Sequence, residues 1–196
     1  MPSAIATASS VASERRTEIV RAARAILEEG GSDYLTMRTL GQRLGVKAPS
    51  LYKHVAGKDE LEAALIAEAL DEIGRALADA VAGARSDQLD ALATAYREYA
   101  LAHPHLYRLA TEQPLPRDRL PEGLEDRAAA PVLEVAGDRD RGRALWAFAH
   151  GMVQLELAGR FPPDADLEAA WRAGLAGFAR QPARARTIVR SWRGPD

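Results

Sequence analysis

Hydrophobic residues recur every three or four positions along most of the chain, which is the spacing of amphipathic helices. Alternating runs of Val, Ile and Thr, which are typical of strands, are missing. Gly and Pro interrupt the helical pattern and mark the ends of the predicted helices. We therefore expect an all-α fold of about nine helices. Their predicted ranges are residues 13–29, 37–45, 48–55, 58–82, 87–102, 104–111, 124–135, 138–159 and 164–179.

Breaks in this pattern divide the chain into a small front unit, 13–57, and a larger back part, 58–181. Gly57 separates the two. The segment 113–123 contains three prolines and is predicted to be a loop. Small and hydroxyl residues predict a disordered tail at 1–12, and the end of the chain, 182–196, is predicted to be a basic tail.

Composition limits the class of protein. With 47% hydrophobic residues among 196, the chain has enough apolar material for a buried core. Its net charge of −2 gives no overall attraction to nucleic acid, so any such signal must be local. The absence of Cys excludes disulfides and thiolate metal sites. Because neither a secretory leader nor a long apolar run is present, we expect a cytoplasmic protein without a membrane partner.

A local concentration of positive charge lies between Tyr34 and Lys58. This stretch holds five Lys or Arg residues and no Asp or Glu. It also contains two short predicted helices joined by a turn at Gly45, which is the pattern of a helix-turn-helix. Such a unit places its second helix in the major groove of double-stranded DNA, and the lack of acids avoids repulsion from phosphates. The pattern favours DNA binding, although a packing role for the helix pair remains open.

The stretch TMRTLGQRLGVKAPSLYKHVAGKDELEAAL, residues 36–65, closely resembles the DNA-binding region of the TetR family of bacterial transcription regulators. The shared features are the Thr and Arg at its start, the Leu-Gly-Val turn, the Leu-Tyr-x-His of the recognition helix and a Lys that opens the next helix. The resemblance implies an all-α homodimer with an N-terminal DNA-binding domain. It also implies a helical C-terminal domain that dimerises and often holds a small-molecule inducer.

Individual DNA-contacting residues follow from the matched positions. Lys47 stands where the family often has a Ser or Thr that caps the recognition helix. A Lys side chain cannot accept hydrogen bonds from backbone amides, so we expect Lys47 to contact DNA directly. Phosphate contacts are implied for Thr36, Tyr52, His54 and Lys58, and base contacts for Lys47, Ala48, Pro49 and Ser50. The cations Arg38 and Lys53 complete the predicted DNA-binding set.

The helix predicted at 138–159 is apolar on nearly all sides, which indicates two packing partners. Its string Trp146-x-x-x-His150-Gly151 resembles the motif of a C-terminal domain class of TetR-type regulators that is named for its Trp, His and Gly. In such proteins the last two long helices form a four-helix dimer interface. The predicted interface residues are Leu145, Phe148, Met152, Leu155, Trp171, Leu175 and Phe178.

A small-molecule effector site is predicted among aromatic and polar residues of the inner helices, because Tyr and Trp combine apolar area with a hydrogen-bonding tip. The candidates are Tyr96, Tyr99, Tyr107, Trp146 and His150, although each could instead be an ordinary core residue.

Other chemistry is disfavoured by the sequence. The pair His103 and His105 flanks a proline, and no adjacent acids complete a metal site. We find no nucleophile motif or phosphate-binding loop, so we expect neither an enzyme nor a cofactor.

Two hypotheses remain for the function. The first is a homodimeric regulator, in our reading a repressor, that leaves its pseudo-palindromic operator when a small molecule binds. The second is a helical homodimer that acts through protein–protein contacts.

Overall fold

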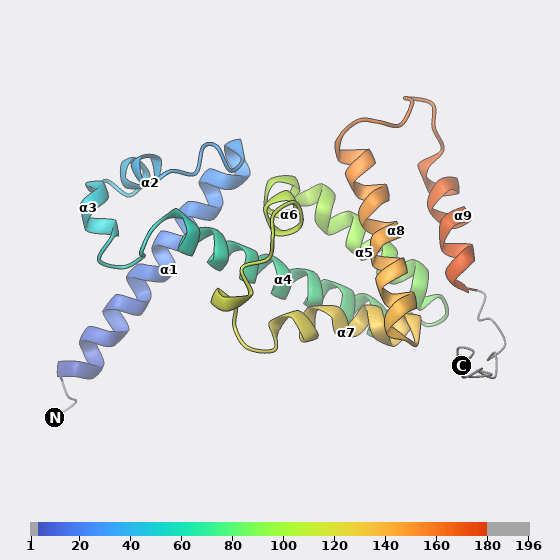
Figure 1. Cartoon of the computed structure of the whole chain (residues 1–196), viewed down its shortest axis with the longest axis horizontal. Coiled ribbons are helices and arrows are strands. Elements are labelled where there is room, and N and C mark those ends of the chain that lie inside the picture. Colours follow the sequence, from blue (N-terminus) through green and yellow to red (C-terminus); the bar gives the residue numbers. More distant parts are fainter. Residues whose placement is uncertain (1–3, 180–196) are drawn as a thin grey trace, which may run out of the picture.

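The computed structural model describes residues 4–179, and these form nine α-helices and one short 3-10 helix, without a strand (Figure 1). The predicted all-α fold is therefore confirmed. The helices are α1 (Ala4–Gly30), α2 (Met37–Arg43), α3 (Ala48–Leu51), α4 (Lys58–Gly83), α5 (Gln88–Ala102), α6 (Pro104–Thr111), η1 (Arg117–Arg119), α7 (Leu124–Ala136), α8 (Arg139–Leu157) and α9 (Leu167–Ala179).

The first helix begins earlier than the sequence predicted. It starts at Ala4, so residues 4–12, which were predicted to be part of a disordered tail, are helical, and the helix does not begin at Ser13. The segment is rich in Ala, the best helix former, and contains no Gly or Pro that would stop the helix. The predicted basic tail at 182–196 lies outside the described residues.

The recognition helix α3 ends earlier than predicted, at Leu51 instead of residue 55. The amides of His54 and Val55 both donate to the Leu51 carbonyl, at 2.9 and 3.1 Å, which closes a turn. This turn buries Val55, which is 2% exposed. The carboxylate of Glu60 accepts the next amide, that of Ala56, at 2.6 Å, and so fixes the connection between α3 and α4.

A first hydrophobic core joins the front unit to the start of the back part. Leu40, Leu51 and Val55 pack with α1. The same cluster includes Leu61 and Leu65 from the first half of α4, together with residues of α6.

A second core occupies the back part and is built from α4, α5, α6, α8 and α9. The second half of α4 contributes Ile73, Leu77 and Val81 to it. Figure 1 shows α4 running from the α1–α3 unit to the far end of the molecule. A single continuous helix therefore belongs to both cores.

The proline-rich segment 113–123 packs on the first core. Leu115 and Leu120 pack on the first core, on either side of η1. Arg119 lies 3.8 Å from Asp59 at the start of α4. This segment thus packs on the core that the front unit shares with α4 and α6, and it contacts the start of α4.

Polar side chains also tie α1 to the back part. Arg24 of α1 makes two hydrogen bonds to Glu72 of α4, and that from Nη2 to Oε2 is 2.9 Å long. Tyr99 of α5 donates its hydroxyl to the same carboxylate at 3.0 Å. Glu28 of α1 contacts Nδ1 of His103, the residue between α5 and α6, at 3.0 Å. The direction of α1 is therefore fixed by partly buried charges as well as by apolar packing.

Gly74 sets the approach of α4 to α7. A Cβ atom at this position would lie 2.9 Å from the Cα of Ala128. The Cα of Ala128 cannot move away unless the whole of α7 moves, so the close packing of α4 and α7 requires glycine at position 74.

We predict that Gly74→Ala destabilises the protein by up to about 2 kcal/mol. Overpacking costs about 1–3 kcal/mol, and the gain in helix propensity returns about 1 kcal/mol of this. Urea unfolding followed by circular dichroism measures the difference. Gly83→Ala is the matched control, because nothing lies within 4 Å of its added Cβ. Equal stability of the two variants would contradict this account of the α4–α7 contact.

We also predict a pH-dependent contribution from Glu72. Hydrogen bonding to Arg24 lowers the pKa of its carboxyl below the ordinary 4.5. A lowered carboxyl pKa stabilises the fold above that ordinary value, and the stabilisation is lost as pH falls through the folded-state pKa. The free energy of unfolding of the native chain should thus exceed that of Glu72→Gln by about 1 kcal/mol near pH 7. The difference should shrink in acid.

Glu68→Gln is the control for this pH experiment. Burial raises the pKa of Glu68, although Arg24 lies 3.7 Å away. A raised carboxyl pKa gives the opposite trend, because ionisation then opposes folding as pH rises. Identical pH profiles for the two variants, measured by urea unfolding across the acid range, would refute the assignment.

Candidate nucleic-acid interface

The start of α2 is capped by two threonines. Thr36 Oγ1 accepts a hydrogen bond from the Thr39 amide at 3.1 Å, and Thr39 Oγ1 accepts one from the Thr36 amide at 3.0 Å. This capping box commonly uses a Glu in the second position. Because Thr39 occupies that position, the N-terminus of α2 is capped without a negative charge.

The turn between α2 and α3 depends on two glycines. Gly45 has φ +65, a left-handed conformation that favours glycine. A Cβ at Gly41 would lie 2.8 Å from the Val46 carbonyl oxygen, and the Val46 amide donates to the Gly41 carbonyl at 2.9 Å. The two helices are therefore held close together by backbone contacts.

The first turn of α3 is exposed. Lys47 occupies the N-cap position and makes no side-chain cap bond, in agreement with the departure noted in the sequence. Pro49 lies within the first turn, where no intrahelical amide is needed. Lys47, Pro49 and Ser50 are exposed, and Ala48 is half-buried.

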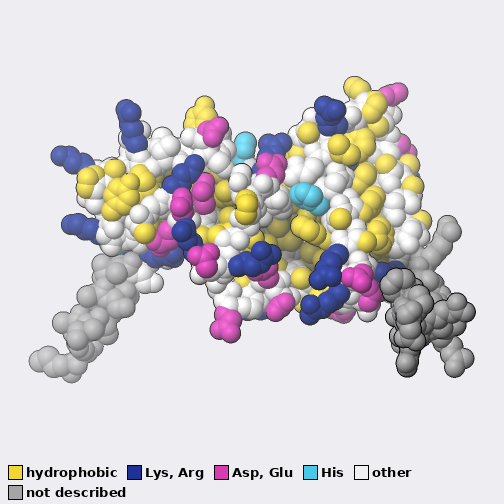
Figure 2. Space-filling model, viewed as in Figure 1, with side chains coloured by type: hydrophobic (Ala, Val, Ile, Leu, Met, Phe, Trp, Pro, Cys, Tyr) yellow, Lys and Arg dark blue, Asp and Glu magenta, His cyan; other side chains and the backbone are white. Residues whose placement is uncertain are grey.

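Three exposed cations surround this tip. Arg38, Lys47 and Lys53 form no ion pair with any residue that the structure describes. The ring of Tyr52 is 54% exposed beside them, and His54 is half-buried. Figure 2 shows Lys and Arg side chains projecting from the end of the molecule that carries α2 and α3. This arrangement leaves positive charge available to an anionic partner.

Two other cations of the same stretch are held by the protein. Arg43 pairs with Glu29 of α1, with Nη1 and Oε1 3.0 Å apart. Lys58, a predicted phosphate contact, donates from Nζ to the Ser32 carbonyl at 2.9 Å and lies 3.4 Å from Glu62. The structure thus gives Lys58 a role in joining α4 to the end of α1.

The sequence did not single out Glu60, which holds the connection between α3 and α4 by accepting the Ala56 amide. Its position in the first turn of α4 was its only local signal.

Four of the five predicted effector residues form one cluster across α5, α6 and α8. The hydroxyls of Tyr96 and Tyr107 are 2.9 Å apart, and the Tyr107 hydroxyl lies 2.7 Å from Nδ1 of His150. Trp146 stacks on His150 with a centroid distance of 5.7 Å and is 49% exposed. The cluster therefore runs from a buried tyrosine to the surface.

Burial controls the protonation of this cluster. It raises the pKa of Tyr96 and of Tyr107, and it lowers the pKa of His150 below its ordinary 6.5. His150 is consequently neutral near pH 7, and its Nδ1 can accept a hydrogen bond from the Tyr107 hydroxyl.

Tyr99 does not belong to this cluster. Its hydroxyl bonds to Glu72 in the network that ties down α1. We therefore assign Tyr99 to the connection between the two parts of the chain.

The predicted dimer residues separate into two groups. Leu145, Trp171 and Leu175 are at most 6% exposed and belong to the second core of the chain itself, so we withdraw them from the interface. Phe148 lies over Gly174 and contacts the rings of Trp171 and Phe178. These contacts join α8 to α9 within one chain. Met152 is half-buried, and Leu155 is 44% exposed.

Metal-binding clusters and membrane spans are both missing from the described part of the chain. No group of three His, Asp or Glu residues among residues 4–179 could hold a metal ion. Within the same range, no helix combines the length and the apolar character that crossing a membrane requires.

Comparisons with known proteins agree with the geometry of the front unit. Residues 19–65 match the sequence family described as bacterial regulatory proteins, tetR family. Residues 89–178 match the family described as Tetracyclin repressor-like, C-terminal domain. The narrower resemblance to the Trp-His-Gly class remains a prediction.

Individual relatives span most of the chain. An uncharacterized HTH-type transcriptional regulator of Mycobacterium tuberculosis, Rv0681, is 38% identical over 154 residues, which cover 74% of this chain and 71% of that protein. The crystal structure of the protein SCO4313 has a TM-score of 0.69 at 27% identity and covers 87% of this chain and 97% of that chain.

A third relative is a single-residue variant of TetR from Acinetobacter baumannii AYE, whose crystal structure was solved in complex with minocycline. It has a TM-score of 0.57 at 25% identity and covers 82% of this chain and 91% of that chain. The helix-turn-helix, the helical back part and these matches lead to one conclusion: the chain belongs to the TetR family of bacterial transcriptional regulators, a family of DNA-binding proteins and not of enzymes.

Proposed function

We propose that this protein is a homodimeric repressor that binds a pseudo-palindromic operator and is released by a small molecule. The observation that carries the DNA-binding role is the tip of α3, where Lys47 and Lys53 are exposed without ion pairs to the described residues and Arg38 lies on the preceding helix. Base edges would be contacted by Lys47 to Ser50, and phosphates by Thr36, Arg38, Tyr52, Lys53 and His54. A regulator of this kind works in the cytoplasm, where bacterial DNA is found.

The dimer would form through the outward faces of α8 and α9. Ala147, Leu155 and Ala173 are exposed there, and no atom lies within 4 Å of a Cβ built at Gly151 or Gly177. A face of small apolar residues supports close packing of a second copy. Two such faces would combine into a four-helix interface, which replaces the more buried residues that the sequence suggested.

The effector would bind at the Tyr96–Tyr107–His150 cluster and enter beside Trp146. Support comes from the mixture of apolar rings and hydrogen-bonding tips, and from the relative that was solved with minocycline. Tyr107 and His103 lie one turn apart, at α6 and its N-cap, and the Tyr107 amide donates to the His103 carbonyl at 2.8 Å. A ligand that displaces Tyr107 from His150 would thus disturb the contact of His103 with Glu28 of α1.

Control then follows from linkage. The two recognition helices of a dimer must lie about 34–36 Å apart to enter successive major grooves. A ligand that binds better to a dimer with another spacing of these helices must weaken DNA binding. By linkage, DNA weakens the binding of the ligand by the same factor.

Selection of bound fragments from a random DNA pool tests this proposal. We expect purified protein without added ligand to enrich one pseudo-palindrome, with affinity that falls steeply as salt rises. Lys47→Ala should relax the sequence preference at the contacted base and cost about 1–3 kcal/mol of binding. Lys53→Ala should weaken binding equally for all sequences.

Arg85→Ala is the matched control. Arg85 is an exposed cation in the connection between α4 and α5, far along the chain from the tip, and its replacement should leave affinity unchanged. A folded protein that enriches no sequence, together with absence of co-purified ligand by mass spectrometry, would sink the proposal and favour action through protein contacts. The enriched operator can then be used to screen for small molecules that release the protein from DNA. Tyr107→Phe should reduce this release without lowering the affinity for DNA.

A further inference from the structure

Lysine is confined to one short stretch of this chain. The sequence holds 26 Lys and Arg residues, and the three lysines among them are Lys47, Lys53 and Lys58. The stretch that they span includes the recognition helix α3. Lys and Arg carry the same charge but differ in chemistry, because an ammonium group can give up a proton and become a nucleophilic amine, whereas a guanidinium in a protein cannot. A reagent that attacks amines therefore meets side-chain amines only in the DNA-binding unit or beside it.

Two of the three lysines present their amines without a partner. Lys47 and Lys53 are exposed, and neither amine makes an ion pair or a hydrogen bond with any residue that the structure describes. Arg38 on α2 is likewise exposed and unpaired within the described residues. Figure 2 shows these basic side chains projecting from the end of the molecule that carries α2 and α3. Both amines are therefore open to a reagent, and the field around them is positive.

Lys58 is the internal comparison, because its amine is held by the protein. Its Nζ donates to the Ser32 carbonyl at 2.9 Å and lies 3.4 Å from Oε1 of Glu62. Asp59, the next residue, is exposed. The nitrogen must leave its acceptor before it can attack a reagent, and the neighbouring carboxylates repel an anionic reagent.

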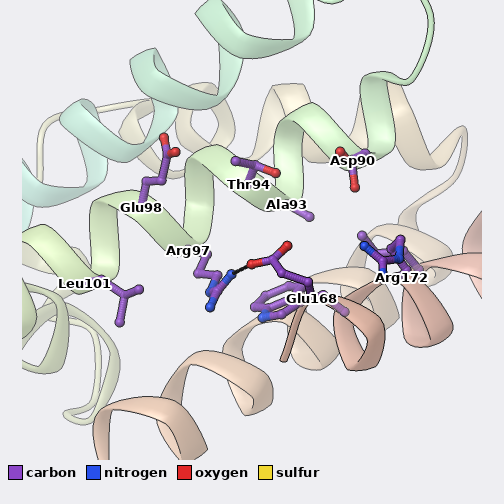
Figure 3. A pocket seen from close by; sticks show the side chains of 10 residues that line it. Asp90, Ala93, Thr94, Arg97, Glu98, Leu101, Glu168 and Arg172 are labelled. Carbon is purple, nitrogen blue, oxygen red and sulfur yellow. Dashed lines mark hydrogen bonds and ion pairs between the residues drawn. The ribbon is translucent and has the colours of Figure 1, made fainter. Parts of the chain in front are cut away.

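Positive charge in the back part is carried by arginine. Arg97 of α5, for example, bonds to Glu156 of α8 and to Glu168 of α9, and Figure 3 shows it reaching Glu168. The charge of such an arginine is already compensated, and its guanidinium does not react as an amine. Amine chemistry can thus change the charge at the tip of α3 without altering the ion pairs of the back part.

We propose that Lys47 and Lys53 form an acylation site, at which an acyl phosphate switches off DNA binding. The free amine attacks the acyl carbon, the bond from this carbon to the phosphate oxygen breaks, inorganic phosphate leaves, and the amine proton passes to solvent. Two cations become neutral amides, so the tip loses charge that it needs for DNA contacts. An acyl phosphate is an anion and collects at unpaired cations. The inference rests on the proposed function, because it regulates the same DNA-contacting surface.

The test compares two acetyl donors on the full chain. Acetyl phosphate is an anion, whereas N-acetoxysuccinimide is neutral. Peptide mass spectrometry with fragmentation follows the acetylation rate of each lysine. We expect acetyl phosphate at low salt to modify Lys47 and Lys53 at least about fivefold faster than Lys58. This preference should be smaller for the neutral donor, and it should shrink at high salt, where the attraction is screened.

The second readout is affinity for the enriched operator. Acetylation should weaken operator binding at least about tenfold, because base and phosphate contacts are lost together. A double variant with Lys47→Arg and Lys53→Arg keeps both charges but has no amine at the tip, so acetyl phosphate should not change the affinity that this variant has. Lys58→Arg is the matched control, and its operator binding should still be weakened by acetylation.

Equal acetylation rates at all three lysines would overturn the proposal, as would the same preference with both donors. It also fails if the chain acetylated at Lys47 and Lys53 binds the operator as tightly as the unmodified chain. An unmodified chain that binds no DNA sequence would instead contradict the proposed function itself, and the acetylation rates would still decide whether the site is selective.

Discussion

The helix α4 is the constraint on which the rest of the structure depends, because it is one rigid element shared by two hydrophobic cores. Its first half buries Leu61 and Leu65 against the DNA-binding unit, and its second half buries Leu77 and Val81 in the back part. Hydrogen bonds of a helix resist bending, and neither core can move along the helix without breaking its own packing. A change of packing around one half of α4 must therefore reorient the other half.

In the front unit the acidic side chains form internal contacts, whereas the lysines at the tip of α3 remain unpaired within the described residues. The acids near the boundary hold the unit together: Glu29 pairs with Arg43, Glu62 lies by Lys58, and Glu60 accepts the Ala56 amide in the connection between α3 and α4. The tip of α3 has no acid of its own, so its lysines stay unpaired within the described residues. A chain with a net charge of −2 can in this way present a positive surface, because its acids either form contacts inside the front unit or lie in the back part.

The front unit was predictable because its signals are local. The cap at Thr36, the Gly45 turn and the buried positions Leu40 and Leu51 are all encoded within a few residues of one another. The start of α1 was misplaced because Ser13 is a good N-cap only when the preceding residues leave the helix. The end of α3 was misplaced because the amides of His54 and Val55 both turn back to the Leu51 carbonyl, and Glu60 of the next helix holds the Ala56 amide that follows.

The back part was harder to predict because its contacts join distant segments. Periodicity shows that Leu145 and Trp171 are apolar positions, but it cannot tell a core within the chain from an interface between chains. Likewise, the pairing of Tyr99 with Glu72 and of Arg97 with Glu156 depends on how α4, α5 and α8 cross. The cavity that Asp90 and Arg97 of α5 line together with Trp171 of α9 has no local signature, because α5 and α9 are far apart in the sequence.

The central claim of this account is that α4 joins the DNA-binding unit rigidly to the back part. The chain contains no Cys, so a spin-label pair can be placed at Gln42→Cys on α2 and Glu134→Cys on α7, both exposed positions. The labelled chain is diluted into an excess of unlabelled chain, and the distance between the two labels is measured by double electron–electron resonance. A single narrow distance distribution is the predicted result. A broad or multiple distribution in the ligand-free protein would mean that the unit swings independently of the back part, and it would contradict the account.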